Sequence, residues 1–113
     1  MNTTPQFLVT NDKTSGENLK LDFLRLKKAA MILRALNHKL RQLLIKLIDE
    51  HQKITVTEIY VNLRLEQSVV SQHLAILRRA GIVVTQREGK FIFYSLNYNR
   101  LKEINNFIEQ LVS

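Results

Sequence analysis

The chain has 113 residues and no cysteine, and its 17 Lys and Arg against 10 Asp and Glu give a formal charge of +7. This length suits one domain with a real core, and the lack of cysteine excludes disulfides, thiolate metal sites and thiol redox chemistry. No apolar run approaches the roughly 20 residues of a membrane-spanning helix, and the N-terminus lacks a secretory signal pattern. The sequence therefore predicts a cytoplasmic protein with no membrane partner, and its basic charge favours a polyanion such as nucleic acid.

The N-terminal part divides at about residue 18. Residues 1–18 are polar and contain the only proline, which predicts a flexible tail before a single domain over residues 19–113. A helix is expected from about residue 19 to 36, with an apolar stripe that includes Phe23, Leu26 and Leu33. This stripe is wider than a terminal helix of one small domain needs, so we expect part of it to face a partner.

Two further helices are expected before residue 63. Asn37 is placed to cap a helix over about residues 38–50. Thr55 followed three residues later by Glu58 is a capping-box pattern, which predicts a short helix over about residues 56–62.

The segment from residue 67 to 80 predicts a helix with two unlike faces. Val70, Leu74 and Leu77 recur at i, i+4 and i+7 and form a core stripe. The opposite face is short, polar and basic, and consists of Ser68, Ser71, Gln72, Ala75 and Arg79. A solvated helix face is usually richer in Glu and Lys, whereas a small polar face lets the backbone approach a partner closely.

After Gly81 the apolar period becomes two, which predicts a β-hairpin around Glu88-Gly89-Lys90. Its tip carries Arg87 and Lys90. A last helix is expected over about residues 98–111, with an apolar seam that suits packing against another helix. That seam could cover the domain's own core, but together with the first stripe it favours a homodimer. The predicted dimer interface consists of Phe23, Leu26, Leu33, Leu101, Ile104, Phe107, Ile108 and Leu111.

These elements together predict a mainly α fold, a winged helix-turn-helix of five helices with a hairpin wing between the fourth and fifth. The small face of the fourth helix fits the DNA major groove, which is about 12 Å wide. We expect Gln67, Ser68, Ser71 and Gln72 to lie near base edges, because recognition helices read bases with their N-terminal half. Further along the chain, Arg79 is expected to contact phosphate, and Arg87 and Lys90 on the wing are expected to contact phosphate or to enter the minor groove.

The stretch LRLEQSVVSQHLAILRRAGIVVTQREGKFIFYSL resembles the ArsR-type family of small winged-helix repressors, and ALNHKLRQLL is similar to the family's second-helix entry, with Arg41 at its usual basic position. The resemblance covers about Ala35 to Ser95. It implies a two-fold dimer formed largely by the first and last helices, which represses transcription by occupying operators and is released by a ligand.

The sequence departs from the family at its familiar metal sites. Thr55 and Thr57 stand where many members have the cysteines that bind soft metals, and a hydroxyl is a poor ligand for such ions. The last helix has Glu103 and Glu109 but no histidine. We therefore expect no metal or other cofactor, and the inducer is left open.

Three classes of function fit this sequence to different degrees. The favoured hypothesis is a sequence-specific, homodimeric repressor that binds double-stranded DNA at a pseudo-palindromic operator. The alternative is a protein-interaction module on a winged-helix scaffold, against which the basic wing argues. An enzyme is not expected, because the sequence shows no nucleophile-base set, glycine-rich phosphate loop or metal constellation.

Overall fold

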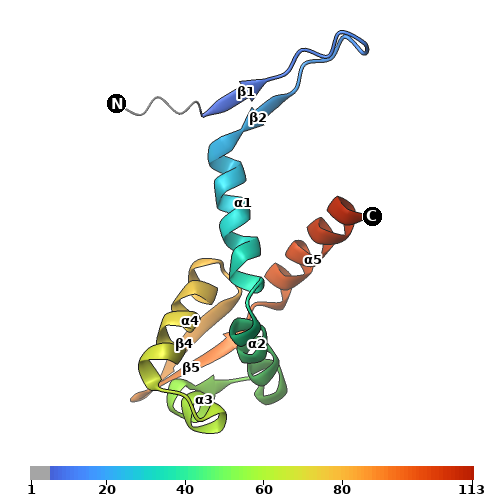
Figure 1. Ribbon diagram of the computed structural model, residues 1–113. Helices are drawn as coiled ribbons and strands as arrows, with labels where there is room; N and C mark the ends of the chain where they lie inside the picture. Colours follow the sequence, from blue (N-terminus) through green and yellow to red (C-terminus); the bar gives the residue numbers. More distant parts are fainter. Residues whose placement is uncertain (1–5) are drawn as a thin grey trace, which may run out of the picture. The chain divides into compact units, whose positions relative to one another are not determined.

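A computed structural model describes residues 6–113 of the chain (Figure 1). The chain forms two compact units, one that ends at Ile32 and one that comprises Leu33–Ser113. None of the helices within residues 6–113 combines the length and the apolar character needed to cross a bilayer.

The first unit contains a β-ribbon, the two-stranded hairpin over residues 6–22. Strand β1 (Phe7–Val9) pairs antiparallel with β2 (Lys20–Asp22). The backbone nitrogen of Thr10 donates to the carbonyl of Leu19 at 2.7 Å, and this bond continues the ladder into the loop. In the loop the Asp12 carboxylate accepts hydrogen bonds from the backbone of Thr14 and from the backbone and hydroxyl of Ser15.

This ribbon corrects the prediction for the N-terminal part. The sequence pattern indicated no strand before residue 19 and a helix from residue 19 on. In the structure residues 20–22 are a strand, and helix α1 (Phe23–Leu36) begins directly after it, four residues later than predicted. The start of α1 is set by Asp22, whose side chain accepts from the backbone of Leu24 and Arg25 at 3.0 and 3.1 Å. Residues 1–5 of the predicted tail lie outside the described residues, and the domain boundary at residue 18 stays a prediction.

The second unit opens, after the end of α1, with helix α2 (Lys39–His51). Its N-cap is His38, whose Nδ1 accepts from the backbone nitrogen of Leu40 at 3.1 Å. The prediction that Asn37 caps this helix is therefore wrong by one residue. The acceptor is the imidazole nitrogen of His38 and not the expected amide oxygen of Asn37.

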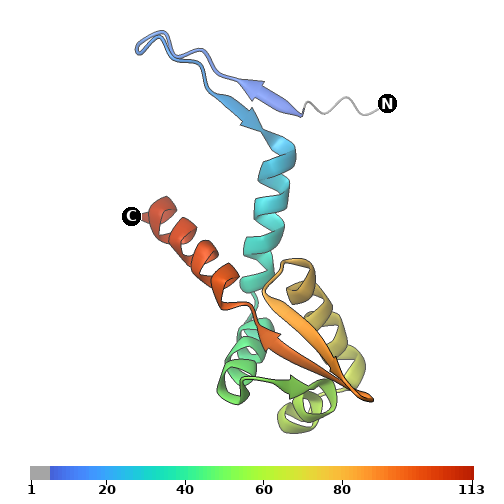
Figure 2. The same ribbon diagram turned by 180° about the vertical axis from the view of Figure 1, so that it is seen from behind.

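The helix-turn-helix and the wing follow as predicted. Strand β3 (Ile54–Thr55) leads into α3 (Val56–Leu63), where the Thr55 hydroxyl accepts from the backbone of Glu58 at 3.2 Å, as the capping-box pattern predicts. Then come α4 (Gln67–Arg79), strands β4 (Val83–Glu88) and β5 (Phe91–Leu96), and α5 (Tyr98–Val112). The strands form an antiparallel sheet in the order β3-β5-β4 (Figure 2).

The core of the second unit lies between α2, α3, α4 and the sheet. The side chains that are most completely buried come from all of these elements, and they are Leu44, Ile48, Ile54, Ile59, Val70, Leu74, Leu77, Ile82 and Val83. The stripe predicted for α4, Val70 with Leu74 and Leu77, is at most 1% exposed. Burial of this stripe fixes which face of α4 points outward. The order of the elements in residues 6–113 confirms the predicted winged helix-turn-helix.

Candidate nucleic-acid interface

The turn that precedes α4 sets where the outer face begins. Arg64 ends α3 with φ 55° and ψ 44°, a left-handed conformation that favours glycine. The backbone nitrogen of Leu65 donates to the carbonyl of Tyr60 at 3.0 Å and closes the turn. Glu66 then stands at the N-cap of α4 without a side-chain capping bond. Its negative charge at the helix N-terminus is still favourable.

The end of α4 is fixed by a Schellman motif. The nitrogen of Gly81 donates to the carbonyl of Arg78 at 2.9 Å, and that of Ile82 donates to the carbonyl of Leu77 at 3.0 Å. Gly81 has φ 76°, which a side chain would strain, and an added Cβ would lie 3.4 Å from Nε of Arg100. The same Arg100 Nε donates to the carbonyl of Ala80 at 3.2 Å. Helix α4 is thus held rigidly at the end from which the wing departs.

The outer face of α4 is the surface formed by Gln67, Ser68, Ser71, Gln72 and Ala75. All five residues are exposed. None of the polar ones among them forms a side-chain hydrogen bond to another described residue. The face therefore presents hydroxyl and amide groups whose hydrogen-bonding capacity is open to an outside partner.

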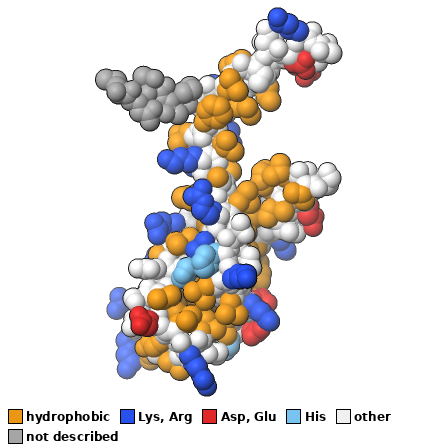
Figure 3. Space-filling view, in the orientation of Figure 1, with side chains coloured by type: hydrophobic (Ala, Val, Ile, Leu, Met, Phe, Trp, Pro, Cys, Tyr) orange, Lys and Arg blue, Asp and Glu red, His pale blue; other side chains and the backbone are white. Residues whose placement is uncertain are grey.

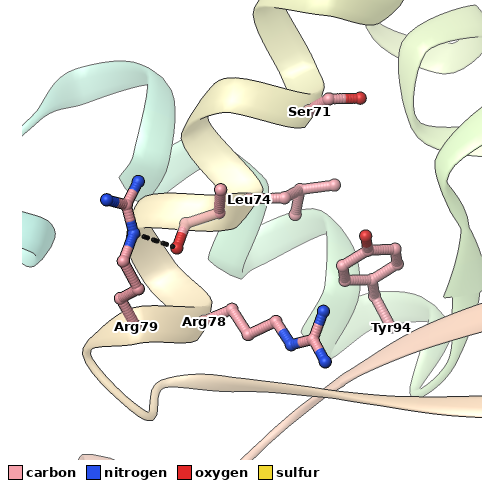
Figure 4. A pocket seen from close by; sticks show the side chains of 6 residues that line it. Ser71, Leu74, Arg78, Arg79 and Tyr94 are labelled. Carbon is pink, nitrogen blue, oxygen red and sulfur yellow. Dashed lines mark hydrogen bonds between the residues drawn. The ribbon is translucent and has the colours of Figure 1, made fainter.

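A hollow of about 460 Å³ lies beside this face and extends from α4 to the sheet. It is lined by Ser71, Leu74, Ala75, Arg78, Arg79 and Tyr94. In Figure 4 the Arg78 side chain extends from α4 toward Tyr94, while Arg79 projects from the other side of the helix. The hollow joins the small side chains of α4 to two guanidinium groups and a phenol.

Arg78 is the residue of this surface that sequence reasoning missed. The prediction named Arg79, which also lines the hollow. Its Nε donates to the carbonyl of Ala75 at 3.3 Å, its side chain is exposed, and its phosphate contact stays a prediction. A signal for Arg78 was present, because Ser71, Ala75 and Arg78 follow one another at i, i+4 and i+7. That spacing places Arg78 on the small face.

The wing brings its two predicted basic residues to its tip. Arg87 and Lys90 are exposed on either side of Gly89, whose φ of 62° allows the tight turn. Arg87 Nε donates to the carbonyl of Gly89 at 3.1 Å. Next to them, Lys53 Nζ binds both carboxylate oxygens of Glu88 at 2.8 and 2.9 Å. Since Glu88 is neutralised by Lys53, the tip keeps the positive charge of Arg87 and Lys90.

In the space-filling view, Lys and Arg side chains lie along the edge of the second unit where Figure 1 shows α4 and the tip of the wing (Figure 3). A positive edge beside a small polar helix face is the electrostatic footprint expected of a DNA-binding surface.

A buried arginine connects α4 to α2 and to the end of α1. Arg41 is only 7% exposed, and its Nε and Nη2 donate to the carbonyls of Ala35 and Arg34 at 2.7 and 2.9 Å. Its Nη1 lies 3.2 Å from Nδ1 of His73 on α4. Because an arginine only donates, Nδ1 of His73 is the acceptor, and the proton of the neutral ring is on Nε2.

His73 is half-buried, and the pKa of its imidazole is lowered from its ordinary value of 6.5. Burial is the main cause, followed by the nearby His38 and Arg41. The His38 and His73 rings lie with centroids 4.7 Å apart. A neutral His73 therefore completes the contact of α4 with Arg41.

The eight residues predicted to form a dimer interface differ in exposure. Of those in the second unit, Ile104 is only 6% exposed and packs in the chain's own core, while Phe107 and Leu111 are 46% and 64% exposed. Leu33, Leu101 and Ile108 are half-buried. In the first unit Leu26 is 62% exposed and Phe23 is half-buried. A large apolar surface thus remains open on both terminal helices.

Within residues 6–113, no three His, Asp or Glu side chains come close enough together to hold a metal ion. Thr55, at one of the family's cysteine positions, is buried and engaged in capping α3, while Thr57 is exposed.

Comparison with known proteins identifies the family. Residues 38–85 match the family model described as bacterial regulatory protein, arsR family. The chain is 36% identical over 85 residues to an HTH-type transcriptional regulator of Methanocaldococcus jannaschii, a match that covers 75% of this chain and 96% of that protein. The chain belongs to the ArsR family. The predicted resemblance is confirmed.

Solved structures of the family share the fold. The repressor PagR of Bacillus anthracis is 30% identical to this chain and superposes with a TM-score of 0.60. The match covers 80% of this chain and 99% of the PagR chain. HlyU from Vibrio cholerae is 36% identical, covers 78% and 95%, and gives a TM-score of 0.58. These proteins are transcriptional regulators and not enzymes, so this chain is a DNA-binding transcription regulator of the same winged-helix family. The prediction that it is not an enzyme is confirmed.

Proposed function

We propose that this regulator is a cytoplasmic homodimer that represses transcription by binding a pseudo-palindromic operator. The observation that carries the proposal is the outer face of α4, which is exposed and forms no side-chain hydrogen bond to the rest of residues 6–113, next to a basic wing. An exposed face of this kind has lost no hydrogen-bonding capacity to the fold and can exchange water for base edges.

Each part of the surface has a distinct role in this proposal. Ser71 and Gln72 lie in the N-terminal half of α4 and read bases in the major groove, where a glutamine amide matches the donor and acceptor of adenine. Gln67 and Ser68, one turn earlier, lie near base edges of the same groove. Arg79, Arg87 and Lys90 bind phosphates, which gives affinity and salt dependence without sequence preference.

Homodimerisation is proposed through the terminal helices. Two copies of α4 must be presented to one duplex at half-sites about one DNA turn apart. The support is the exposed apolar surface on α1 and α5, which includes Leu26, Phe107 and Leu111. The buried Ile104 would contribute by supporting α5 from inside rather than by touching the second copy.

The signal that controls the repressor is proposed not to be a metal bound at the family's usual sites. Thr55 is engaged in capping α3 through its hydroxyl, and neutral hydroxyls are weak ligands for soft ions.

Repression rather than activation is supported by relatives such as PagR, which is named a transcriptional repressor. HlyU, however, is named a transcriptional activator. A promoter fusion with and without the regulator separates the two: repression requires expression to rise when the regulator is removed.

The base-reading role is tested with the double variant Ser71→Ala/Gln72→Ala. We expect the wild type to protect a site in a footprint of the DNA upstream of its own gene. In the variant, specific affinity should fall by about 10-fold or more, and binding to unrelated duplexes should change far less. The matched control is Asn106→Ala, an exposed amide on α5, which should leave both affinities unchanged. Equal losses of specific and non-specific binding in the double variant would contradict base reading by this face.

A further inference from the structure

The β-ribbon of residues 6–22 has one apolar face. Leu8 pairs directly with Leu21, and Leu19 follows on the same face, because side chains alternate between the two sides of a strand. These three leucines are 47%, 41% and 58% exposed. None of them carries charge or a polar group. The leucines form a continuous patch that this chain leaves in contact with water.

The opposite face of the ribbon is different in character. Phe7 pairs with Asp22 and Val9 pairs with Lys20. Lys20 Nζ lies 4.0 Å from the centroid of the Phe7 ring, a cation–π contact. The ribbon is therefore amphipathic, with a leucine face and a face that carries both charges of its strands.

A ribbon of this size needs a cover for its leucine face. Each strand has three residues, and an isolated two-stranded hairpin is marginally stable in water unless its apolar side packs against something. The loop is ordered by local bonds to Asp12, but these bonds do not cover the leucines.

The ribbon is also joined to α1 without a linker. The backbone nitrogen of Phe23, the first residue of α1, donates to the carbonyl of Gln6 at 2.7 Å, and Asp22 caps the helix. Along α1 the side chains of Leu24, Leu26 and Met31 are 48% to 62% exposed. The leucine face is thus continuous in the chain with the apolar surface through which dimerisation is proposed.

We propose that the leucine face of the ribbon is an added part of the dimer interface and is covered by a second copy of this chain. The inference rests on the proposed homodimer. The continuity of the leucine face with the exposed apolar surface of α1 supports this occupant. Because each copy carries +7 and the two copies therefore repel each other, their contact is favoured where the facing surfaces carry no charge. The uncharged leucine face meets this condition, whereas a phosphate backbone would select a basic surface.

The test measures the dimer dissociation constant of the full-length chain by sedimentation equilibrium. In Leu8→Ser/Leu21→Ser we expect the dissociation constant to rise by at least about 10-fold, since each leucine is present twice in a symmetric dimer. The matched control is Val9→Ser, which removes an exposed apolar side chain of the same strand from the opposite face. The control should stay within about twofold of the wild type. An unchanged dissociation constant in the double variant overturns the proposal.

A photo-crosslink covers the case in which serine merely unfolds the ribbon. Benzoylphenylalanine in place of Leu8 keeps an apolar side chain there, and illumination should give a product of twice the chain's mass. The same group in place of Val9 should give little of it. Crosslinks that stay within one chain, or none at all, overturn the proposal. If Leu8→Ser/Leu21→Ser loses binding to anionic lipid vesicles while its dimer dissociation constant is unchanged, the leucine face binds lipid, and the proposal is overturned as well.

Failure of this inference is distinguishable from failure of the proposed function. If the wild type is dimeric and binds its operator while the double variant keeps the wild-type dimer constant, only the ribbon's role is wrong. If the wild type is monomeric at micromolar concentration and shows no specific DNA binding, the proposed dimeric repressor itself is wrong.

Discussion

The outer face of α4 and the leucine face of the ribbon are both exposed, but they differ in chemistry. The first consists of small hydroxyl, amide and methyl groups on a helix whose other side is at most 1% exposed. The second consists of leucines on a short ribbon. Exposed polar groups that make no internal bond suit a polar, hydrated partner such as a DNA groove. Exposed leucines suit a protein surface that excludes water.

This comparison shows that exposure alone does not identify an interface. The support behind each face adds to the distinction. Helix α4 is held by its buried stripe, by the Schellman motif and by Arg41 through His73, so its outer face is presented rigidly. The ribbon depends on local bonds and on whatever covers its leucines.

The largest effect is expected on the free energy of unfolding, when a substitution on the buried side of α4 is compared with one on its outer face. Leu74→Ala should lower the free energy of unfolding by about 2–5 kcal/mol, because it leaves a cavity in the core. Gln72→Ala, two residues earlier, should change it by no more than about 0.5 kcal/mol. Urea denaturation followed by circular dichroism measures both. Similar losses in the two variants would show that the outer face is part of the fold.

The next effect concerns Arg78, which lines the hollow next to the outer face. Arg78→Ala should weaken specific DNA binding by about 1–3 kcal/mol, because a guanidinium near the groove can bind a base edge or a phosphate. Arg78→Lys keeps the charge and distinguishes these two roles. If lysine restores the full affinity, Arg78 binds phosphate; if it does not, the forked geometry is needed. Gel-shift titrations measure both variants, and wild-type affinity in Arg78→Ala would exclude the hollow from the interface.

A smaller effect is expected at the wing. Arg87→Ala/Lys90→Ala should weaken specific and non-specific DNA binding alike, by about 1 kcal/mol, and reduce the slope of log affinity against log salt by up to about 2. The matched control is Lys46→Ala/Lys102→Ala, which removes two exposed charges from α2 and α5. If the control flattens the slope as much as the wing variant does, net charge rather than the wing's position is responsible.

The smallest effect is a pH dependence of the support behind α4. Because the pKa of His73 is lowered in the folded chain, folding favours the neutral ring. The resulting stability is present above the unfolded pKa of 6.5 and is lost as pH falls through the folded value. His73→Gln keeps an acceptor for Arg41 but does not titrate, so its unfolding free energy should fall less on acidification below pH 6.5. Parallel pH profiles for the two chains would contradict the role given to His73.

The parts of the fold that sequence could predict are those with strong local signals. Helix α4 has an apolar stripe at helical spacing and ends at Gly81, and the wing has Gly89 between strands of period two. The capping-box pattern of Thr55 and Glu58 predicted the start of α3. Each of these signals lies within a few residues of the feature that it determines.

The features that sequence missed depend on distant or very short pairings. The ribbon consists of two three-residue strands separated by ten residues, too short to show a period. The contact between Arg41 and His73 joins residues 32 positions apart. The cap of α2 depends on the local backbone: His38 is extended, with φ −157° and ψ 129°, and this lets its ring reach the helix. For Arg78 the spacing was visible, but the direction of its side chain was not.

The measurement that tests the central claim most directly is selection of binding sites from random duplexes with the purified full-length chain. The account predicts an enriched pseudo-palindrome whose half-site centres lie about one DNA turn apart, and the enrichment should be lost in Ser71→Ala/Gln72→Ala. Recovery of sequences without a shared motif, or of the same motif by the wild type and the variant, would contradict the claim that the outer face of α4 reads DNA.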